Sequence, residues 1–165
     1  FMNSKKLFIW GFLFMSVIGT LLHFVYEWSG NNSIVRLFAP WNESTWEHMK
    51  LLFFPMLALV LFLFFKLPEQ SPIPVALSIG TLVGLALIPI LFYTYTGVLG
   101  FSVMAIDIAI FYISVLGAFL IGWFLNDNRE LANRRGLLLT CLVILAILFF
   151  IFSYYPPEIG LFQEP

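Results

Sequence analysis

Five long apolar runs, separated by short polar stretches, limit what this chain can fold into. Each run has roughly 20 residues, the length of α-helix needed to cross the roughly 30 Å hydrocarbon core of a bilayer. The stretches between them contain proline, glycine or charged residues, which end helices. The runs lie at 7–28, 45–65, 73–95, 101–125 and 136–155. They predict an all-α fold: a polytopic membrane bundle of five transmembrane helices, forming a single domain over 1–165.

The composition excludes several other classes of protein. Hydrophobic residues make up 61% of the chain and charged residues only 10%, whereas a soluble domain carries about a quarter charged residues. Too few polar side chains are therefore present to cover a water-soluble globule. Eight Lys and Arg against nine Asp and Glu give a net charge of -1, so no basic surface is expected for nucleic acid. Cys141 is the single cysteine and has no partner for an intramolecular disulfide.

Positively charged residues predict the orientation, because they are enriched in cytoplasmic loops. If the N-terminus is inside, only Arg36 and Lys50 lie outside. The other six then fall in cytoplasmic segments: Lys5, Lys6, Lys66, Arg129, Arg134 and Arg135. We therefore expect a cytoplasmic N-terminus and an extracytoplasmic C-terminus.

A stripe of polar side chains follows the first helix. Ser16, Thr20, His23 and Glu27 are spaced by four, three and four residues, which places them on one helix face. Ionisable groups at membrane depth are costly and usually face a cavity or a partner. The stripe is therefore a candidate site, with His23 about one turn, roughly 5 Å, below Glu27. The alternative is a packing face whose hydroxyl groups bond locally.

Three more ionisable residues, Glu43, Glu47 and His48, lie where the second helix begins. Ser44 and Glu47 have the S-x-x-E spacing of a capping box, which predicts a helix start near Thr45. Glu43 then lies in the preceding loop and can turn toward the first helix. A start at Glu43 instead puts both carboxylates on one face. The structural alternative is that acidic side chains in a first turn only complement the helix dipole.

Asp107 is a lone carboxylate, expected about one and a half turns, roughly 9 Å, into the fourth helix. At that depth it requires a cation, a metal or a proton. Pairing with Lys50 or Arg36 is the structural alternative.

All of these ionisable side chains are expected at a similar depth on the outer side, where they would converge on one outward-facing pocket. Two imidazoles and several carboxylates are typical ligands of a divalent transition metal such as zinc. The candidate metal ligands are His23, Glu27, Glu43, Glu47 and His48. The candidate catalytic residues are Glu27, Glu43, His48 and Asp107. The same set also suits a proton relay without a metal, because histidine and desolvated carboxylates titrate near neutral pH.

Three kinds of function fit these features. The first is a membrane-embedded enzyme, with or without a metal, that acts on a lipid or lipid-linked substrate. The second is a small proton- or ion-coupled transporter or channel, in which Asp107 and Glu27 titrate. The third is a non-catalytic ligand-binding membrane protein whose polar cluster only holds helices together. Gly80 and Gly84 have a spacing typical of close helix packing, within the chain or in a homo-oligomer.

Three segments carry a resemblance to a known family. They are Tyr-Glu-Trp-Ser-Gly-Asn at 26–31, Asn-Glu-Ser at 42–44 with Trp-Glu-His at 46–48, and Tyr-Thr-Tyr-Thr-Gly at 93–97. Together they resemble a family of small bacterial integral membrane proteins that is known as a domain of unknown function. The resemblance covers nearly the whole chain. It implies a multi-pass protein of a bacterial plasma membrane, of the Gram-positive type, and no activity or assigned site.

A second likeness is to the translocator-protein (tryptophan-rich sensory protein) family, which also has five helices and a similar length. Phe-Ala-Pro-Trp at 38–41, followed by Trp46, is similar to that family's proline- and tryptophan-bearing loop between its first two helices. The acidic and histidine cluster is not part of that pattern. The family's porphyrin or sterol binding is therefore not carried over to this chain.

Overall fold

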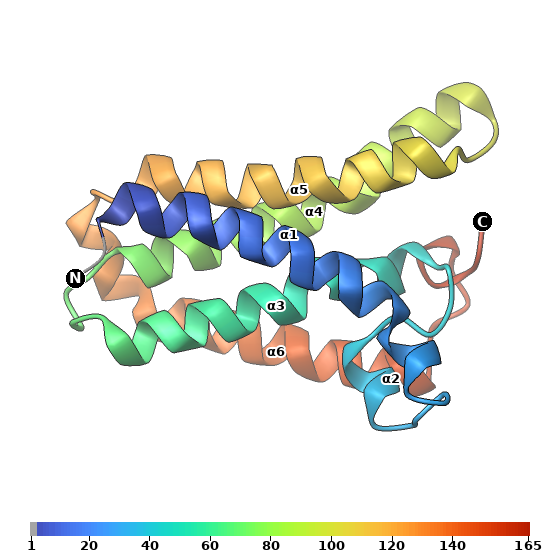
Figure 1. The fold of residues 1–165 in the computed structure, drawn as a ribbon, viewed down its shortest axis with the longest axis horizontal. Coiled ribbons are helices and arrows are strands. Elements are labelled where there is room, and N and C mark those ends of the chain that lie inside the picture. The colour runs from blue at the N-terminus through green and yellow to red at the C-terminus, as the bar shows by residue number, and fades with distance from the viewer. Residues whose placement is uncertain (1–2) are drawn as a thin grey trace.

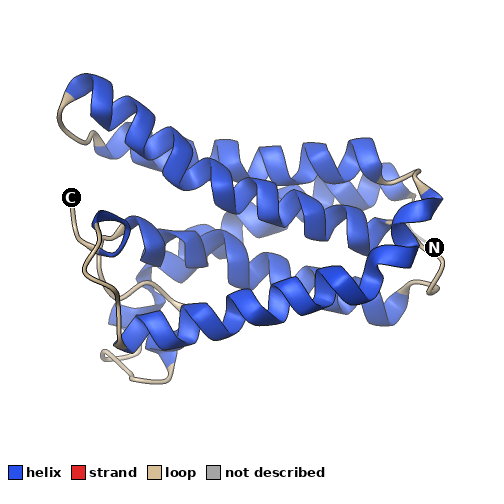
Figure 2. Cartoon of the chain, turned by 180° about the vertical axis from the view of Figure 1, so that it is seen from behind, coloured by secondary structure: helices blue, strands red, loops and turns tan. Residues whose placement is uncertain are grey.

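The structure is a computed structural model that describes residues 3–165, and over this range it is all-α (Figures 1 and 2). Its elements are α1 (Ser4–Trp28), α2 (Val35–Phe38), α3 (Thr45–Lys66), α4 (Ile73–Leu99), α5 (Met104–Leu125), the 3-10 turn η1 (Arg129–Arg134), α6 (Arg135–Tyr154) and the 3-10 turn η2 (Gly160–Phe162).

Five of these helices are long and apolar enough to cross a membrane, with mean hydropathy between 2.0 and 2.8. They coincide with the five predicted runs, which confirms the predicted helical bundle. The largest difference is at α4, which continues to Leu99; α1 begins three residues earlier than predicted, at Ser4, and α5 three residues later, at Met104. Gly100 explains where α4 ends, because its left-handed φ of 80° closes the helix and its N–H donates to the Thr96 carbonyl.

The long helices run up and down the bundle, and the start of α1 lies at the opposite end of it from the C-terminus (Figure 1). The α1–α3 connection with α2, the α4–α5 turn and the segment after α6 all gather at the end where the C-terminus lies. This end of the bundle carries the residues of interest. The tips of α4 and α5 project beyond the other helices there, in both views (Figures 1 and 2).

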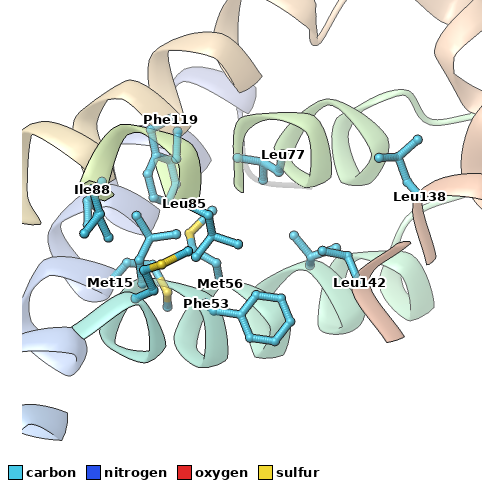
Figure 3. Close-up of a cluster of buried hydrophobic side chains, with 14 of the residues drawn as sticks. Met15, Phe53, Met56, Leu77, Leu85, Ile88, Phe119, Leu138 and Leu142 are labelled. Atoms are coloured by element: carbon cyan, nitrogen blue, oxygen red, sulfur yellow. The ribbon is translucent and has the colours of Figure 1, made fainter. Parts of the chain in front are cut away.

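The core is built around α3 and α4. About half of the apolar window of each is buried, 56% and 50%, against 22% for α1. The side chains that meet between the helices are large and apolar (Figure 3), among them Met15, Phe53, Met56, Leu77, Leu85, Ile88, Phe119, Leu138 and Leu142. Outward-facing apolar side chains such as Phe65, 86% exposed, give the bundle the apolar surface that a lipid bilayer requires.

The glycines of α4 set its close contact with α5. A Cβ at Gly80 would overlap the Ala118 carbonyl oxygen, and one at Gly84 would lie 2.9 Å from the Ser114 carbonyl oxygen. The small-residue packing predicted from the spacing of Gly80 and Gly84 is therefore found within the chain.

Candidate metal centre

The structure brings together three of the predicted site residues, His23, Glu43 and His48. His23 comes from α1, Glu43 from the loop before α3, and His48 from the first turn of α3. One potential ligand atom from each residue lies within 4.8 Å of the other two. The group therefore joins the start of α3 and the loop before it to α1, since His23 lies 20 residues before Glu43 in the sequence.

Direct contacts hold this trio. Nε2 of His48 lies 3.1 Å from Oε2 of Glu43, and the His48 ring stacks on the His23 ring with 5.5 Å between centroids. Nδ1 of His23 is buried and has no hydrogen-bond partner within residues 3–165. A buried ring nitrogen without a partner is costly, and a bound metal ion would satisfy it.

The hydrogen bond from His48 lowers the pKa of Glu43 below its usual value, and the positive fields of His48 and His23 act in the same direction against the opposing effect of burial. Glu43 is therefore held as a carboxylate. A carboxylate is the form that binds a metal cation.

Hydrogen bonds from backbone N–H groups to side-chain oxygens fix the position of Glu43. Oγ of Ser44 caps α3 by accepting a hydrogen bond from the Glu47 N–H at 3.3 Å. The Ser44 N–H in turn donates to Oδ1 of Asn42 at 3.0 Å. The N–H of Glu43 itself donates to Oε1 of Glu164 at 3.3 Å. The predicted helix start at Thr45 is confirmed, with Ser44 as its cap, whereas Asn42 rather than Glu47 bonds the Ser44 N–H.

A small cavity of about 100 Å³ opens beside the trio. His23 and Glu43 line it together with Glu27, whose carboxylate is exposed, and with Trp41. The indole Nε1 of Trp41 is buried without a hydrogen-bond partner in the described part of the chain. Glu27 was predicted both as a metal ligand and as a catalytic residue; it lines the cavity but is not among the three residues whose ligand atoms converge. Trp41 was not predicted as a site residue, because a tryptophan near a span end is ordinarily an interfacial anchor.

Glu47 was predicted as a metal ligand beside the two histidines, but its side chain pairs with Lys50. It is buried and accepts a 2.5 Å hydrogen bond from Nζ of Lys50, which is itself fully buried. Glu47 and His48 are consecutive residues of the helix, so their side chains point in directions about 100° apart. As a result, His48 faces His23 of α1 while Glu47 faces Lys50, so Glu47 is outside the trio of His23, Glu43 and His48.

The Lys50 ammonium makes two further hydrogen bonds, to Oγ of Ser153 at 2.6 Å and to the Arg36 carbonyl at 2.9 Å. The Arg36 guanidinium donates from Nε and Nη2 to the Ser153 carbonyl, at 3.1 and 2.8 Å. It also stacks on the Trp41 ring, 3.8 Å from its centroid. This network ties the α1–α3 connection to α3 and α6. Sequence reasoning placed Arg36 and Lys50 on this side but did not predict the network.

Asp107 lies in the first turn of α5, nearer to the helix end than predicted because α5 begins at Met104. Its carboxylate accepts a hydrogen bond from the Tyr95 hydroxyl of α4, and that hydroxyl also accepts from the Val103 N–H at 3.0 Å. Neither the predicted convergence of Asp107 with the trio nor the structural alternative, a pairing with Lys50 or Arg36, is therefore found among the described residues. Asp107 holds the α4–α5 turn, outside the trio.

The polar stripe of α1 divides into two parts. Ser16 donates to the Phe12 carbonyl, and Thr20 bonds to the Ser16 carbonyl and to the Tyr112 hydroxyl of α5 at 2.7 Å. This half is a packing face, as the structural alternative predicted. The other half, His23 and Glu27, lines the cavity.

The trio fits a transition metal better than an alkaline-earth ion, because two of its three ligands are imidazoles. Ligand atoms around a tetrahedral zinc ion with bonds of ~2.0 Å are about 3.3 Å apart. The His48 and Glu43 atoms already lie 3.1 Å apart, and the ligand atoms of all three residues lie within 4.8 Å of one another. Three protein ligands leave one coordination position open, as in catalytic rather than structural zinc sites.

A model of the family described as a family of unknown function (DUF6512) matches residues 1–165. The chain belongs to this family. Membership confirms the resemblance to a family of unknown function, and it leaves the bacterial origin and the likeness to the translocator-protein family as predictions. No curated protein and no solved structure matches the chain.

Proposed function

We propose that this member of the family is a metal-dependent membrane enzyme in which His23, Glu43 and His48 bind a divalent transition metal such as zinc. The convergence of these three side chains within 4.8 Å supports the proposal most directly. Two histidines and one glutamate are also the ligand set of hydrolytic zinc enzymes, which keep the fourth position for water or substrate.

The chemistry proposed for this site is hydrolysis of an ester or phosphoester: the water oxygen bonds to the carbonyl carbon or the phosphorus, the C–O or P–O bond to the alcohol breaks, and the proton taken from the water is passed to the departing alcohol. A zinc ion held by His23, Glu43 and His48 would lower the pKa of a bound water to about 7 and so make a nucleophile available at neutral pH. Glu27 is the proposed general base, since its carboxylate lines the cavity beside two of the ligands. The Trp41 indole, a buried donor on the same cavity, is proposed to bond the oxygen on which negative charge develops.

The proposed substrate is a lipid or a lipid-linked molecule, acted on at the level of its headgroup. Glu27 and Trp28 are the last two residues of α1, and the cavity beside them lies at an end of the membrane-crossing bundle. In the orientation that the positive residues predict, this end faces away from the cytoplasm. We place the protein in a bacterial plasma membrane on the basis of the sequence resemblance.

Turnover in vesicles tests this proposal. The native chain is reconstituted in vesicles of phosphatidylglycerol, phosphatidylethanolamine and monoglucosyl-diacylglycerol, and lipid products are followed by mass spectrometry with and without zinc. We expect a zinc-dependent product, and a loss of about 100-fold or more in Glu27→Gln because the general base is removed. The matched control is Glu69→Gln, which changes an exposed glutamate in the α3–α4 connection.

The transporter alternative gives a different result in the same vesicles. Proton or cation flux that Glu27→Gln and Asp107→Asn both abolish, with no lipid product, would replace the enzyme proposal with transport. Native turnover in both Glu27→Gln and His48→Ala would also contradict the enzyme proposal.

A further inference from the structure

A second and larger cavity, of about 360 Å³, lies at the same end of the bundle. It is formed between the last turns of α4, the α4–α5 turn and the segment that follows α6. Its volume is in the range of small-molecule binding sites. Neither the trio nor Glu27 lines it.

The wall formed by the C-terminal segment is anchored to the helices. Phe162 of η2 is buried, 9% exposed, and its ring packs against Trp46 at 4.9 Å and Phe152 at 5.2 Å between centroids. Two residues later, the Glu164 carboxylate accepts the hydrogen bond from the Glu43 N–H. Glu164 therefore belongs to the cavity wall and also touches the backbone of a proposed metal ligand.

The lining combines aromatic rings with neutral polar groups. The aromatic side chains are Phe92, Tyr93 and Phe101, and the neutral polar ones include Thr96, Ser102 and Gln163. Thr96 donates its hydroxyl proton to the Phe92 carbonyl, so its oxygen still has a lone pair for a ligand donor.

The charge of the lining determines which ligands it favours. Glu164 is the one charged side chain among the lining residues of this cavity, and no lysine, arginine or histidine is among them. A phosphate or carboxylate would therefore meet a like charge and no cation. Sugar rings have apolar C–H faces that stack on aromatic rings, and hydroxyl groups that bond amides, hydroxyls and carboxylates. This lining suits an uncharged sugar.

We propose that the cavity binds the uncharged sugar headgroup of a glycolipid. The lipid character follows from the surroundings of the cavity: Val98 and Met104, on either side of the lining residues Gly100 to Ser102, are 82% and 77% exposed. This apolar edge offers a surface along which acyl chains can lie. The inference rests on the proposed function, since it names the substrate class and uses Glu164 as the link to the metal centre.

Lipid retention tests the inference without requiring turnover. The purified chain is placed in nanodiscs with equal amounts of monoglucosyl-diacylglycerol and phosphatidylglycerol, and the lipids that stay bound are identified by native mass spectrometry. We expect the native chain to retain the glycolipid preferentially. The double variant Phe101→Ala/Gln163→Leu is expected to lower the ratio of retained glycolipid to phosphatidylglycerol by about tenfold, because it removes a stacking ring and a hydrogen-bonding amide.

Two control variants separate this result from loss of the fold and from loss of the metal. Phe65→Ala/Gln70→Leu makes the same two changes at exposed positions away from the cavity, one near the C-terminal end of α3 and one in the α3–α4 connection. This variant should retain the glycolipid. His48→Ala should also retain the glycolipid, although it is expected to lose zinc. Glycolipid retention and zinc content therefore test the cavity and the proposed metal site independently. Zinc content measured on Phe101→Ala/Gln163→Leu should equal that of the native chain.

Three outcomes would overturn the inference. They are equal retention in the native chain and in Phe101→Ala/Gln163→Leu, preferential retention of phosphatidylglycerol, and displacement of the glycolipid by an equimolar amount of soluble methyl glucoside. The last outcome would assign the cavity to a free sugar rather than to a lipid.

Discussion

The Lys50 ammonium is buried in the interior of the bundle. It donates three hydrogen bonds there, to the Glu47 carboxylate, the Ser153 hydroxyl and the Arg36 carbonyl. Taking such a pair out of water is costly, and the attraction between the partners offsets this cost only when every donor is bonded. Loss of either partner alone would therefore leave a buried charge without compensation. The pair also positions the connection that carries Glu43, because the Arg36 carbonyl belongs to that connection.

Lys50→Met is accordingly expected to lower the free energy of unfolding by about 3–5 kcal/mol, because it leaves the Glu47 carboxylate buried without a partner. Lys50→Met/Glu47→Gln should recover most of this loss, since no charge is then left unpaired. Thermal unfolding in detergent measures both effects. Lys66→Met, at an exposed position of the same helix, serves as the control. A double variant as unstable as the single variant would contradict the account.

Chemistry alone could select the candidate residues, but it could not group them. His23, Glu43 and His48 converge, whereas Glu47 and Asp107 find partners in Lys50 and Tyr95. The deciding factor for Glu47 is the rotation between adjacent helical positions. For Asp107 it is the start of α5, three residues later than the apolar run suggested. The partners of Glu47 and Asp107 therefore could not be predicted from residue spacing alone, because they depend on where the helices begin and how they lie relative to one another.

At the level of elements, long spans were predictable and short ones were not. The five spans follow from hydropathy and length alone. The four-residue α2 has no such pattern, because it is held by contacts distant in the sequence, such as the bonds of Arg36 to the Ser153 carbonyl 117 residues away. The η2 turn is likewise held by Phe162 against Trp46 of α3.

The contact between α4 and α5 provides a prediction at this scale. Gly80→Val should destabilise the protein by about 1–3 kcal/mol or more, because its side chain would overlap the Ala118 backbone. Gly97→Ala, on the same helix, should leave the stability unchanged or slightly raised, since nothing lies within 4 Å of its Cβ and alanine favours helix. Unfolding temperatures of the two variants measure the difference. Equal effects of the two substitutions would count against the described helix contact.

At the level of the whole molecule, the polar groups concentrate at one end of an apolar bundle. The trio, the buried Lys50 network and both cavities all lie there, with the C-terminal segment joining them through Glu164. The Glu27 carboxylate and the Trp41 indole add a base and a donor to the same end. This concentration is what places the proposed chemistry at a membrane surface.

The orientation of the bundle decides which membrane surface that is. In a Cys141→Ala background, Ser33→Cys should react with a membrane-impermeant maleimide on intact cells, because the positive residues predict that the α1–α3 connection is outside. Asp127→Cys, in the α5–α6 connection, should react only after permeabilisation. The reverse pattern of labelling would place the proposed metal centre on the cytoplasmic side.

Metal content is the most direct test of the central claim, that His23, Glu43 and His48 form a metal centre. The chain is purified in detergent without a histidine tag or chelator, incubated with zinc, dialysed and analysed by elemental mass spectrometry beside His23→Ala/His48→Ala and the control Glu158→Ala. We predict about one zinc ion per chain in the native protein and in Glu158→Ala, and almost none in the double variant. Equal zinc in the native chain and the double variant, or none in either, would contradict the account.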